Sequence, residues 1–258
     1  MVKMREIIKE LEVIYRVIIS NKHDQKKIRL VMLRLENLLL KKKMNKEEVY
    51  EIINTLGNKI NVFQDNYEQF ETELEEEFSR KIINSNKETN IKDYQLYKRF
   101  LRLIKEESRL GQIKKGDKVL FIGSGPLPIT AIILNKLKGC EIHCIEKVKN
   151  RAEISKRIIR RLGLQQKINV YNKKGESIKN DDYSIVIIAL LAKPKDRILK
   201  EIFSKVNVGT KIICRTSEGI RQFFYEATNE RLFDKYSEEG KVKAKGDQII
   251  TSALLVKH

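Results

Sequence analysis

Residues 119–130 read VLFIGSGPLPIT, and this stretch decides the fold. Its first four residues are apolar, which is typical of a strand that is buried on both faces. Gly123, Ser124 and Gly125 follow at once, and the two prolines after them favour the start of a helix. Glycines at such a turn let the backbone approach a ligand, and the helix N-terminus favours hydrogen-bond acceptors. We therefore expect a ligand-binding turn between a buried strand and a helix.

Further apolar runs follow this turn, separated by helical segments and Gly-containing turns. They are CEIHCIE (140–146), INVYN (168–172), YSIVIIAL (183–190) and TKIICRT (210–216). Strands that alternate with helices predict a parallel sheet covered on both faces. Near the C-terminus, LFDKYS (232–237) and QIITSALLVK (248–257) resemble a closing antiparallel pair. The expected fold class is therefore α/β, with a Rossmann-like domain at residues 116–258.

Residues 1–115 have a different pattern, with apolar side chains every three to four positions. The stripes cover residues 4–18, 28–39, 45–78 and 94–110, and each predicts an amphipathic helix. Asn45 and Glu48 form a plausible capping pair at the start of the third stripe. We therefore expect an N-terminal α-helical domain at residues 1–115, in front of the Rossmann-like domain.

The formal charge of +18 makes nucleic acid a partner to consider. The basic residues are mostly Lys and are scattered among acidic ones, and the sequence has no Arg-rich tract or RNA-binding aromatic motif. Solvated helix faces account for such a distribution, so nucleic acid is not expected as a partner.

Cysteines, histidines and hydropathy suggest the compartment and the metal content. The three cysteines fit small buried side chains in a reducing compartment, and no apolar stretch is long enough for a membrane span. We expect a cytoplasmic protein that does not associate with a membrane. His23, His143 and His258 lack the spacing of metal ligands, so no metal is expected in the protein itself.

Glu146 narrows the choice of ligand. The turn has Pro128 where the dinucleotide-binding pattern has its third glycine, which argues against a pyrophosphate. Glu146 ends the second strand about 20 residues beyond the turn, where an acid can accept hydrogen bonds from ribose hydroxyls, although it could also serve a helix N-terminus. S-adenosylmethionine (SAM) is therefore the expected ligand. Its predicted contacts are Gly123, Ser124, Gly125, Pro126, Leu127 and Glu146, with Glu176 near the adenine.

Four segments resemble the nicotianamine synthase family, including its archaeal members. GSGPLPIT is similar to the family's GSGPLPLT-type segment, and ICRTSEGIRQFFY (213–225) to its R-[ST]-x-x-G-x-R-x-x-x-Y segment. IALLAKPKDRILKEI (188–202), which includes Ala189 as a further SAM contact, and LYKRFLRLIKEESRLG (96–111) also resemble family segments. The resemblance covers roughly residues 70–258.

The resemblance implies a reaction in which SAM is a substrate. An amino group of an amino acid or intermediate attacks the 3-amino-3-carboxypropyl arm, and methylthioadenosine leaves. The product would be a metallophore that chelates nickel, iron or zinc, and a homodimer is compatible with the sequence.

The resemblance also implies site residues. Glu75 would take the proton from the acceptor ammonium, but it lies in an acidic run, so Glu71 and Glu76 remain alternatives. Phe100 stands where archaeal relatives have a Tyr near the active site, and Tyr97 could supply the hydroxyl instead, although both could be core aromatics. Arg215 and Arg221 could hold a substrate carboxylate or could be structural. The resemblance thus assigns catalytic roles to Glu75 and Tyr97, and substrate-binding roles to Phe100, Arg215 and Arg221.

Two other functions remain as alternatives. A SAM-dependent RNA methyltransferase would suit the positive charge, but the sequence has no Asn-Pro-Pro-aromatic segment and no reactive Cys pair. A helical interaction module with a SAM-like domain would have no activity and would not bind SAM.

Overall fold

The computed structural model describes residues 2–42, 44–85, 89–177 and 182–257. The chain forms two compact units, and each combines segments that are distant in the sequence. Unit 1 comprises Met1–Glu71, Ser217–Ala227 and Ala244–Ile249, and unit 2 comprises Thr72–Thr216, Thr228–Lys243 and Ile250–His258. The predicted division after residue 115 follows the change from helices to strands, whereas the units divide after Glu71. As a domain boundary, the division after residue 115 stays a prediction.

Unit 1 is helical. It contains α1 (Val2–Ser20), α2 (Gln25–Leu40), α3 (Lys46–Leu56) and the first part of α4 (Lys59–Asn84). The predicted capping pair is confirmed, since Asn45 and Glu48 each accept a hydrogen bond from the other's backbone N–H, at 2.8 and 2.9 Å. The third apolar stripe was wrongly predicted as one helix. Gly57, with φ of 53°, ends α3, and α4 begins two residues later.

The core of unit 1 includes an aromatic cluster between α4 and a segment from the second half of the chain. The segment contains the 3-10 helix η2 (Gly219–Phe223). Phe63 of α4 packs on Phe223 with ring centroids 6.1 Å apart, and Tyr67 packs on Phe224 at 4.7 Å. All four side chains are fully buried, so these aromatic contacts hold the inserted segment to the helices.

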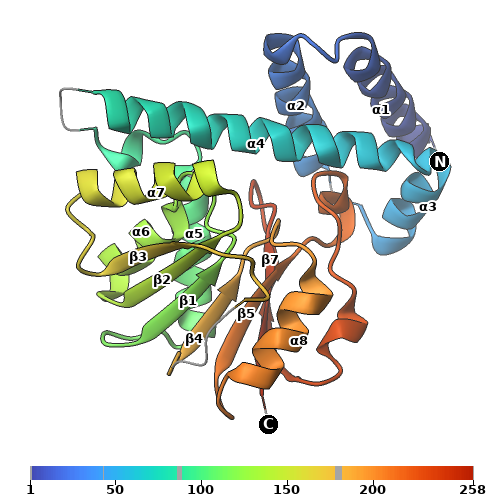
Figure 1. Ribbon diagram of the computed structural model, residues 1–258. Coiled ribbons are helices and arrows are strands. Elements are labelled where there is room, and N and C mark those ends of the chain that lie inside the picture. Colours follow the sequence, from blue (N-terminus) through green and yellow to red (C-terminus); the bar gives the residue numbers. More distant parts are fainter. Residues whose placement is uncertain (1, 43, 86–88, 178–181, 258) are drawn as a thin grey trace. The chain divides into compact units, whose positions relative to one another are not determined.

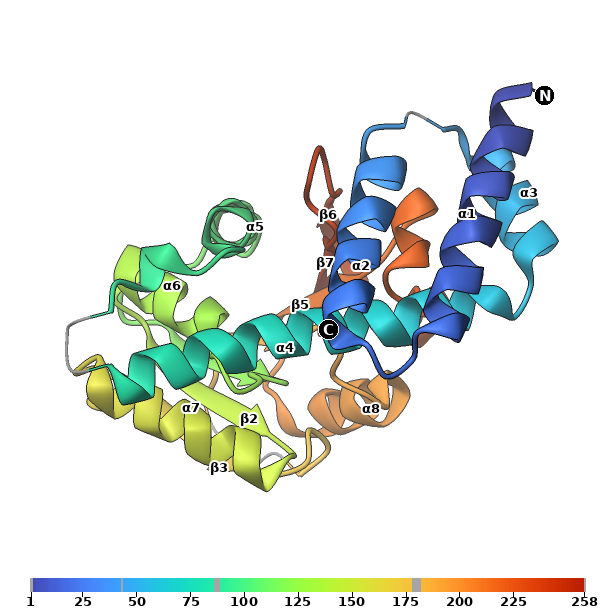
Figure 2. The same ribbon diagram turned by 90° about the horizontal axis from the view of Figure 1, so that it is seen from above.

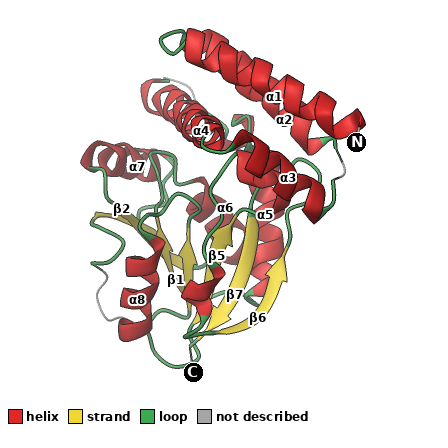
Figure 3. Cartoon of the chain, turned by 90° about the vertical axis from the view of Figure 1, so that its right-hand side faces the viewer, coloured by secondary structure: helices red, strands yellow, loops and turns green. Residues whose placement is uncertain are grey.

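Unit 2 is built on a seven-stranded sheet with the order β3-β2-β1-β4-β5-β7-β6 (Figures 1 and 3). Strands β1 to β5 are parallel, and β7 is antiparallel to both of its neighbours. The predicted Rossmann-like α/β fold is therefore confirmed. LFDKYS was placed too early as a strand, because η3 (Glu230–Phe233) occupies its start. The strands are β1 (Lys118–Ile122), β2 (Glu141–Glu146), β3 (Ile168–Asn172), β4 (Ile185–Ile188), β5 (Lys211–Thr216), β6 (Ser237–Val242) and β7 (Thr251–Val256).

Helices cover both faces of this sheet. Figures 2 and 3 show α5 (Tyr97–Leu110) and α6 (Ile129–Lys138) on one face and α8 (Lys195–Lys205) on the other. The chain leaves β1 towards β2 and leaves β4 towards β5, so adjacent strands β1 and β4 send their helices to opposite faces. A ligand site is expected where the order reverses in this way, beyond the carboxyl ends of β1 and β4. The remaining elements of unit 2 are the second part of α4, η1 (Ile91–Asp93) and α7 (Lys149–Arg161).

The three cysteines are free and buried in unit 2. Burial raises the pKa of the Cys140 and Cys214 thiols to about 11, with the nearby Asp117 adding to the shift at Cys140, and it raises the pKa of Cys144 further. They therefore pack as small apolar side chains. Within the described ranges, every helix is too short or too polar to span a bilayer.

Candidate active site

The turn after β1 packs directly against the turn after β4. Gly123 has φ of 84°, and its N–H donates to the Ile145 carbonyl of β2 at 2.8 Å. A Cβ added to Gly123 would lie 3.1 Å from the methyl carbons of both Ala189 and Ala192. The left-handed backbone and the close approach both explain a glycine at this position. The two turns meet where the strand order reverses, so the predicted contacts Gly123 and Ala189 lie together.

Polar groups in and beside this turn fit an adenosyl ligand. Ser124 is buried, and its hydroxyl has no hydrogen-bond partner among the described residues. The buried carboxylate of Glu146 accepts hydrogen bonds from the N–H groups of Gly125, at 3.0 Å, and Val148, at 2.8 Å. Glu146 thus holds both the turn and the start of α7. A carboxylate has about four acceptor positions, so these two bonds leave capacity for ribose hydroxyls.

Glu75 of α4 lies against the second glycine of the turn. A Cβ added to Gly125, which has φ of 69°, would lie only 2.7 Å from Glu75 Oε2. The alternatives have other partners: Glu76 pairs with Arg80 at 3.7 Å, and in unit 1 Glu71 accepts a hydrogen bond from the Tyr225 hydroxyl. Among the three candidate carboxylates, the described contacts bring Glu75 to the ligand-binding turn.

Replacing Gly125 with Ala is expected to reduce turnover by about tenfold or more, because the new methyl displaces the Glu75 carboxylate and a 1 Å misplacement is costly. Gly163→Ala is the matched control. Gly163 also has positive φ, of 66°, but a Cβ there meets nothing within 4 Å. Steady-state rates and thermal unfolding of both variants check this, and equal rate losses in the two variants would contradict it.

The described contacts relate three other predicted site residues less directly to the ligand-binding turn. They are Glu176, Tyr97 and Phe100. Glu176 is partly buried, next to Gly175, where a Cβ would lie 2.8 Å from Ile122 at the end of β1. Tyr97 is partly exposed at the first position of α5. Phe100 is buried, and its ring lies 6.5 Å from that of Tyr94. This contact agrees with the alternative in which Phe100 is a core aromatic, and the catalytic role of Tyr97 stays a prediction.

Arg215 is held by a carboxylate of the protein itself. It is 2% exposed, and its Nε and Nη2 donate to the two oxygens of Glu107 at 2.8 and 2.9 Å. Both Nη atoms also lie 3.1 Å from Thr130 Oγ1, and the guanidinium lies over the Phe121 ring. Ser252 completes the cluster with a 2.7 Å bond to Glu107. These contacts favour the structural alternative for Arg215 over a role in holding a substrate carboxylate.

Arg221 belongs to unit 1 and also binds acceptors of the protein. Its Nε donates to the Gln248 carbonyl at 2.7 Å and its Nη2 to the Gly246 carbonyl at 3.1 Å. Burial lowers the pKa of its guanidinium. These bonds connect residues 217–227 to residues 244–249, so the contacts of Arg221 again support a structural role.

Comparison with known protein families shows to which family the chain belongs. The model of the family described as "Nicotianamine synthase protein" matches residues 3–258. The chain belongs to the nicotianamine synthase family. The resemblance found in four short segments therefore extends over nearly the whole chain, including the N-terminal helices.

Solved and curated proteins similar to this family member agree with the assignment. A glutamate-to-glutamine mutant of MtNAS in complex with S-adenosylmethionine is 25% identical, with a TM-score of 0.87, over 99% of this chain and 96% of that one. MtNAS in complex with MTA and tNA is 26% identical, with a TM-score of 0.88 and coverage of 99% and 97%. The L-histidine 2-aminobutanoyltransferase of Yersinia pestis is 25% identical over 125 residues. That of Pseudomonas aeruginosa is 26% identical over 125 residues. These matches span about half the length of the two curated relatives, 47% and 48%, and 48% of this chain.

Some interacting residues of this family member were not singled out from its sequence. Glu107 lies on the apolar stripe of α5, one turn after Leu103 and Ile104, and a carboxylate there signals a buried partner. Lys195 is the first residue of α8, where a cation opposes the helix dipole. Thr130 gave no such signal, because a Thr in the first turn of a helix is common.

Proposed function

We propose that this member of the nicotianamine synthase family transfers the 3-amino-3-carboxypropyl group of SAM to the amino group of an amino acid or of an intermediate. The observation that supports this best is the Glu75 carboxylate against Gly125 of the ligand-binding turn. A general base is thereby next to the backbone expected to hold the SAM substrate. Methyl transfer to RNA is not favoured, because the whole chain matches the nicotianamine synthase family.

SAM would bind across the turns after β1 and β4. The Ser124 hydroxyl offers a buried polar group without a protein partner among the described residues, and Glu146 has acceptor capacity for the ribose hydroxyls. Gly123, Ala189 and Ala192 present only backbone and methyl groups to each other, which lets the two turns approach closely. Pro126, Leu127 and Glu176 are proposed as further contacts on sequence grounds.

Glu75 would make the acceptor nucleophilic. An amino acid arrives as an ammonium ion, and the carboxylate can both attract this cation and take one of its protons. The freed amine then attacks the carbon of the aminocarboxypropyl arm that is bonded to sulfur. A C–N bond forms, the C–S bond breaks, and its electron pair stays on the sulfur of neutral methylthioadenosine. The proton lost by the acceptor is held by Glu75 until it passes to solvent.

The acceptor and the product follow from this chemistry. The curated relatives are named L-histidine 2-aminobutanoyltransferases, so L-histidine is the first acceptor to test, with glutamate and SAM itself as alternatives. A product that joins amino and carboxylate groups on one chain would chelate nickel, iron or zinc. We place the reaction in the cytoplasm, because the protein's free thiols fit a reducing compartment.

Incubation of the purified protein with SAM and each acceptor tests the proposal. We expect release of methylthioadenosine, together with a product heavier than the acceptor by one aminocarboxypropyl group, measured by liquid chromatography and mass spectrometry. Release of S-adenosylhomocysteine with a methylated acceptor or a methylated RNA would contradict the proposal. Absence of SAM binding in calorimetry would favour the non-catalytic interaction module.

A further inference from the structure

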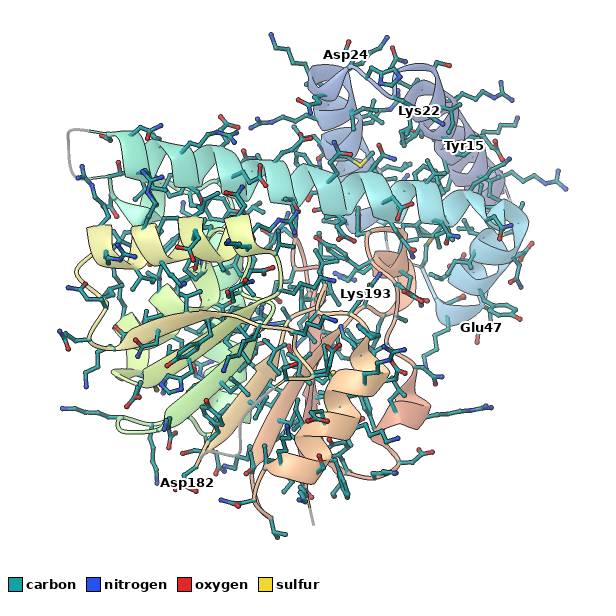
Figure 4. All side chains as sticks on the ribbon, viewed as in Figure 1. Tyr15, Lys22, Asp24, Glu47, Asp182 and Lys193 are labelled. Atoms are coloured by element: carbon teal, nitrogen blue, oxygen red, sulfur yellow. The ribbon has the colours of Figure 1, made fainter. Side chains whose placement is uncertain are left out.

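Lys195 is a cation at the N-terminus of a helix, where cations are unfavourable. It is the first residue of α8 and directly follows Pro194, the N-cap residue. Cations near a helix N-terminus are disfavoured by the helix dipole and the unpaired N–H groups. Lys195 is also partly buried, whereas Lys193, which precedes the helix and is labelled in Figure 4, belongs to the exposed residues by its surface area. A cation in this position needs acceptors that offset the cost.

These acceptors are the backbone carbonyls just after β4. Lys195 Nζ donates to the Leu190 carbonyl at 2.5 Å and to the Ala189 carbonyl at 3.3 Å. Ala189 and Leu190 are both buried residues, so their carbonyls depend on donors from the protein. A charged donor makes a stronger hydrogen bond to a carbonyl than a neutral one does. Lys195 therefore fixes the backbone immediately after β4.

The same backbone forms one side of the proposed SAM site. The Ala189 N–H donates to the Ile122 carbonyl of β1 at 2.9 Å, and the Ala192 N–H donates to the Ala189 carbonyl at 3.2 Å. The resulting turn brings the methyl groups of Ala189 and Ala192 against Gly123. A shift of this turn would therefore reach the ligand-binding turn at Gly123, whereas Glu75 lies against the same turn at Gly125.

We propose that Lys195 is a positioning residue for SAM, holding the turn after β4 against the turn after β1 through the carbonyls of Ala189 and Leu190. This inference rests on the proposed function, in which the two turns bind SAM. Lys195 acts through the backbone and has no part in proton transfer. Its loss should consequently weaken SAM binding and leave the chemical step nearly intact.

The variant Lys195→Met keeps the length of the side chain and removes its charge and donors. We expect the Kd for SAM in calorimetry and the KM for SAM to rise by about tenfold, the size of effect that lost hydrogen bonds to a charged group produce. The kcat should stay within about twofold. Lys195→Arg keeps the charge and the donors and should restore most of the affinity. Lys200→Met, at an exposed position of the same helix, is the control and should leave both constants unchanged.

Two results would overturn the inference. One is a Kd for SAM in Lys195→Met equal to that of the wild type. The other is a joint loss of kcat, affinity and thermal stability in both the Met and Arg variants, which would mean that Lys195 is needed only for folding. The measurement of SAM binding needs no acceptor. Wild-type protein that binds SAM but releases no methylthioadenosine would therefore refute the proposed function, and the Kd values of the Lys195 variants could still be compared with that of the wild type.

Discussion

The variant Glu75→Gln is expected to bind SAM as tightly as the wild type and to turn over about two to four orders of magnitude more slowly. The amide has nearly the same shape as the carboxylate, so the contact with Gly125 is kept. It cannot accept a proton from the ammonium of the acceptor, and it does not attract that cation. The remaining rate would come from the small fraction of acceptor that arrives already deprotonated.

This pattern is measurable because binding and turnover are separate readouts. Calorimetry gives the Kd for SAM, and release of methylthioadenosine at saturating substrates gives kcat. Glu76→Gln is the matched control, because Glu76 is the next residue of α4 and its described partner is Arg80. We expect the Glu76 variant to keep both constants close to wild type.

Two outcomes would remove Glu75 from the proposed role. If Glu75→Gln keeps its turnover, another group takes the proton. If the variant loses SAM binding and turnover in proportion, Glu75 supports the ligand-binding turn and does not act on the acceptor. A larger effect at Glu76 than at Glu75 would mean that Glu76 takes the proton of the acceptor.

The sequence predicted those features that depend on neighbouring residues. The strand and turn around Gly123 are recognisable because apolar run, glycines and prolines follow one another within twelve positions. The capping pair of Asn45 and Glu48 is equally local. The break at Gly57 was missed because the apolar spacing continues across it, and one glycine inside a helical pattern is tolerated often enough to be ambiguous.

The features that the sequence did not predict depend on residues far apart in the chain. The partners of Arg215, for example, lie 108 and 85 positions away, at Glu107 and Thr130. An arginine in a family segment suggests a substrate carboxylate just as readily as a protein carboxylate until the fold brings α5 to β5. The choice among Glu71, Glu75 and Glu76 was open for the same reason, because all three fit one acidic run.

Removing one partner of the Arg215–Glu107 pair is expected to cause the largest loss of stability that we predict. Both side chains are at most 2% exposed, so Glu107→Gln would leave a guanidinium that has lost its buried counter-charge. Breaking a buried pair in this way costs about 3–5 kcal/mol. For a chain of this size, each kcal/mol lowers Tm by roughly 2–4 °C. Denaturant and thermal unfolding of the purified protein would measure this loss of stability.

The double variant Glu107→Leu with Arg215→Met separates a structural arginine from a substrate-binding one. Replacing both charges with apolar groups leaves no unpaired ion, so the double variant should be more stable than either single variant. If Arg215 is only structural, the folded double variant should keep a KM for the acceptor close to that of the wild type. A folded double variant whose KM for the acceptor rises by about tenfold or more would return Arg215 to the substrate site, since a charged hydrogen bond to a carboxylate is worth that much. The exposed pair of Glu153 and Lys156 offers the control, where Lys156→Met should change neither stability nor KM.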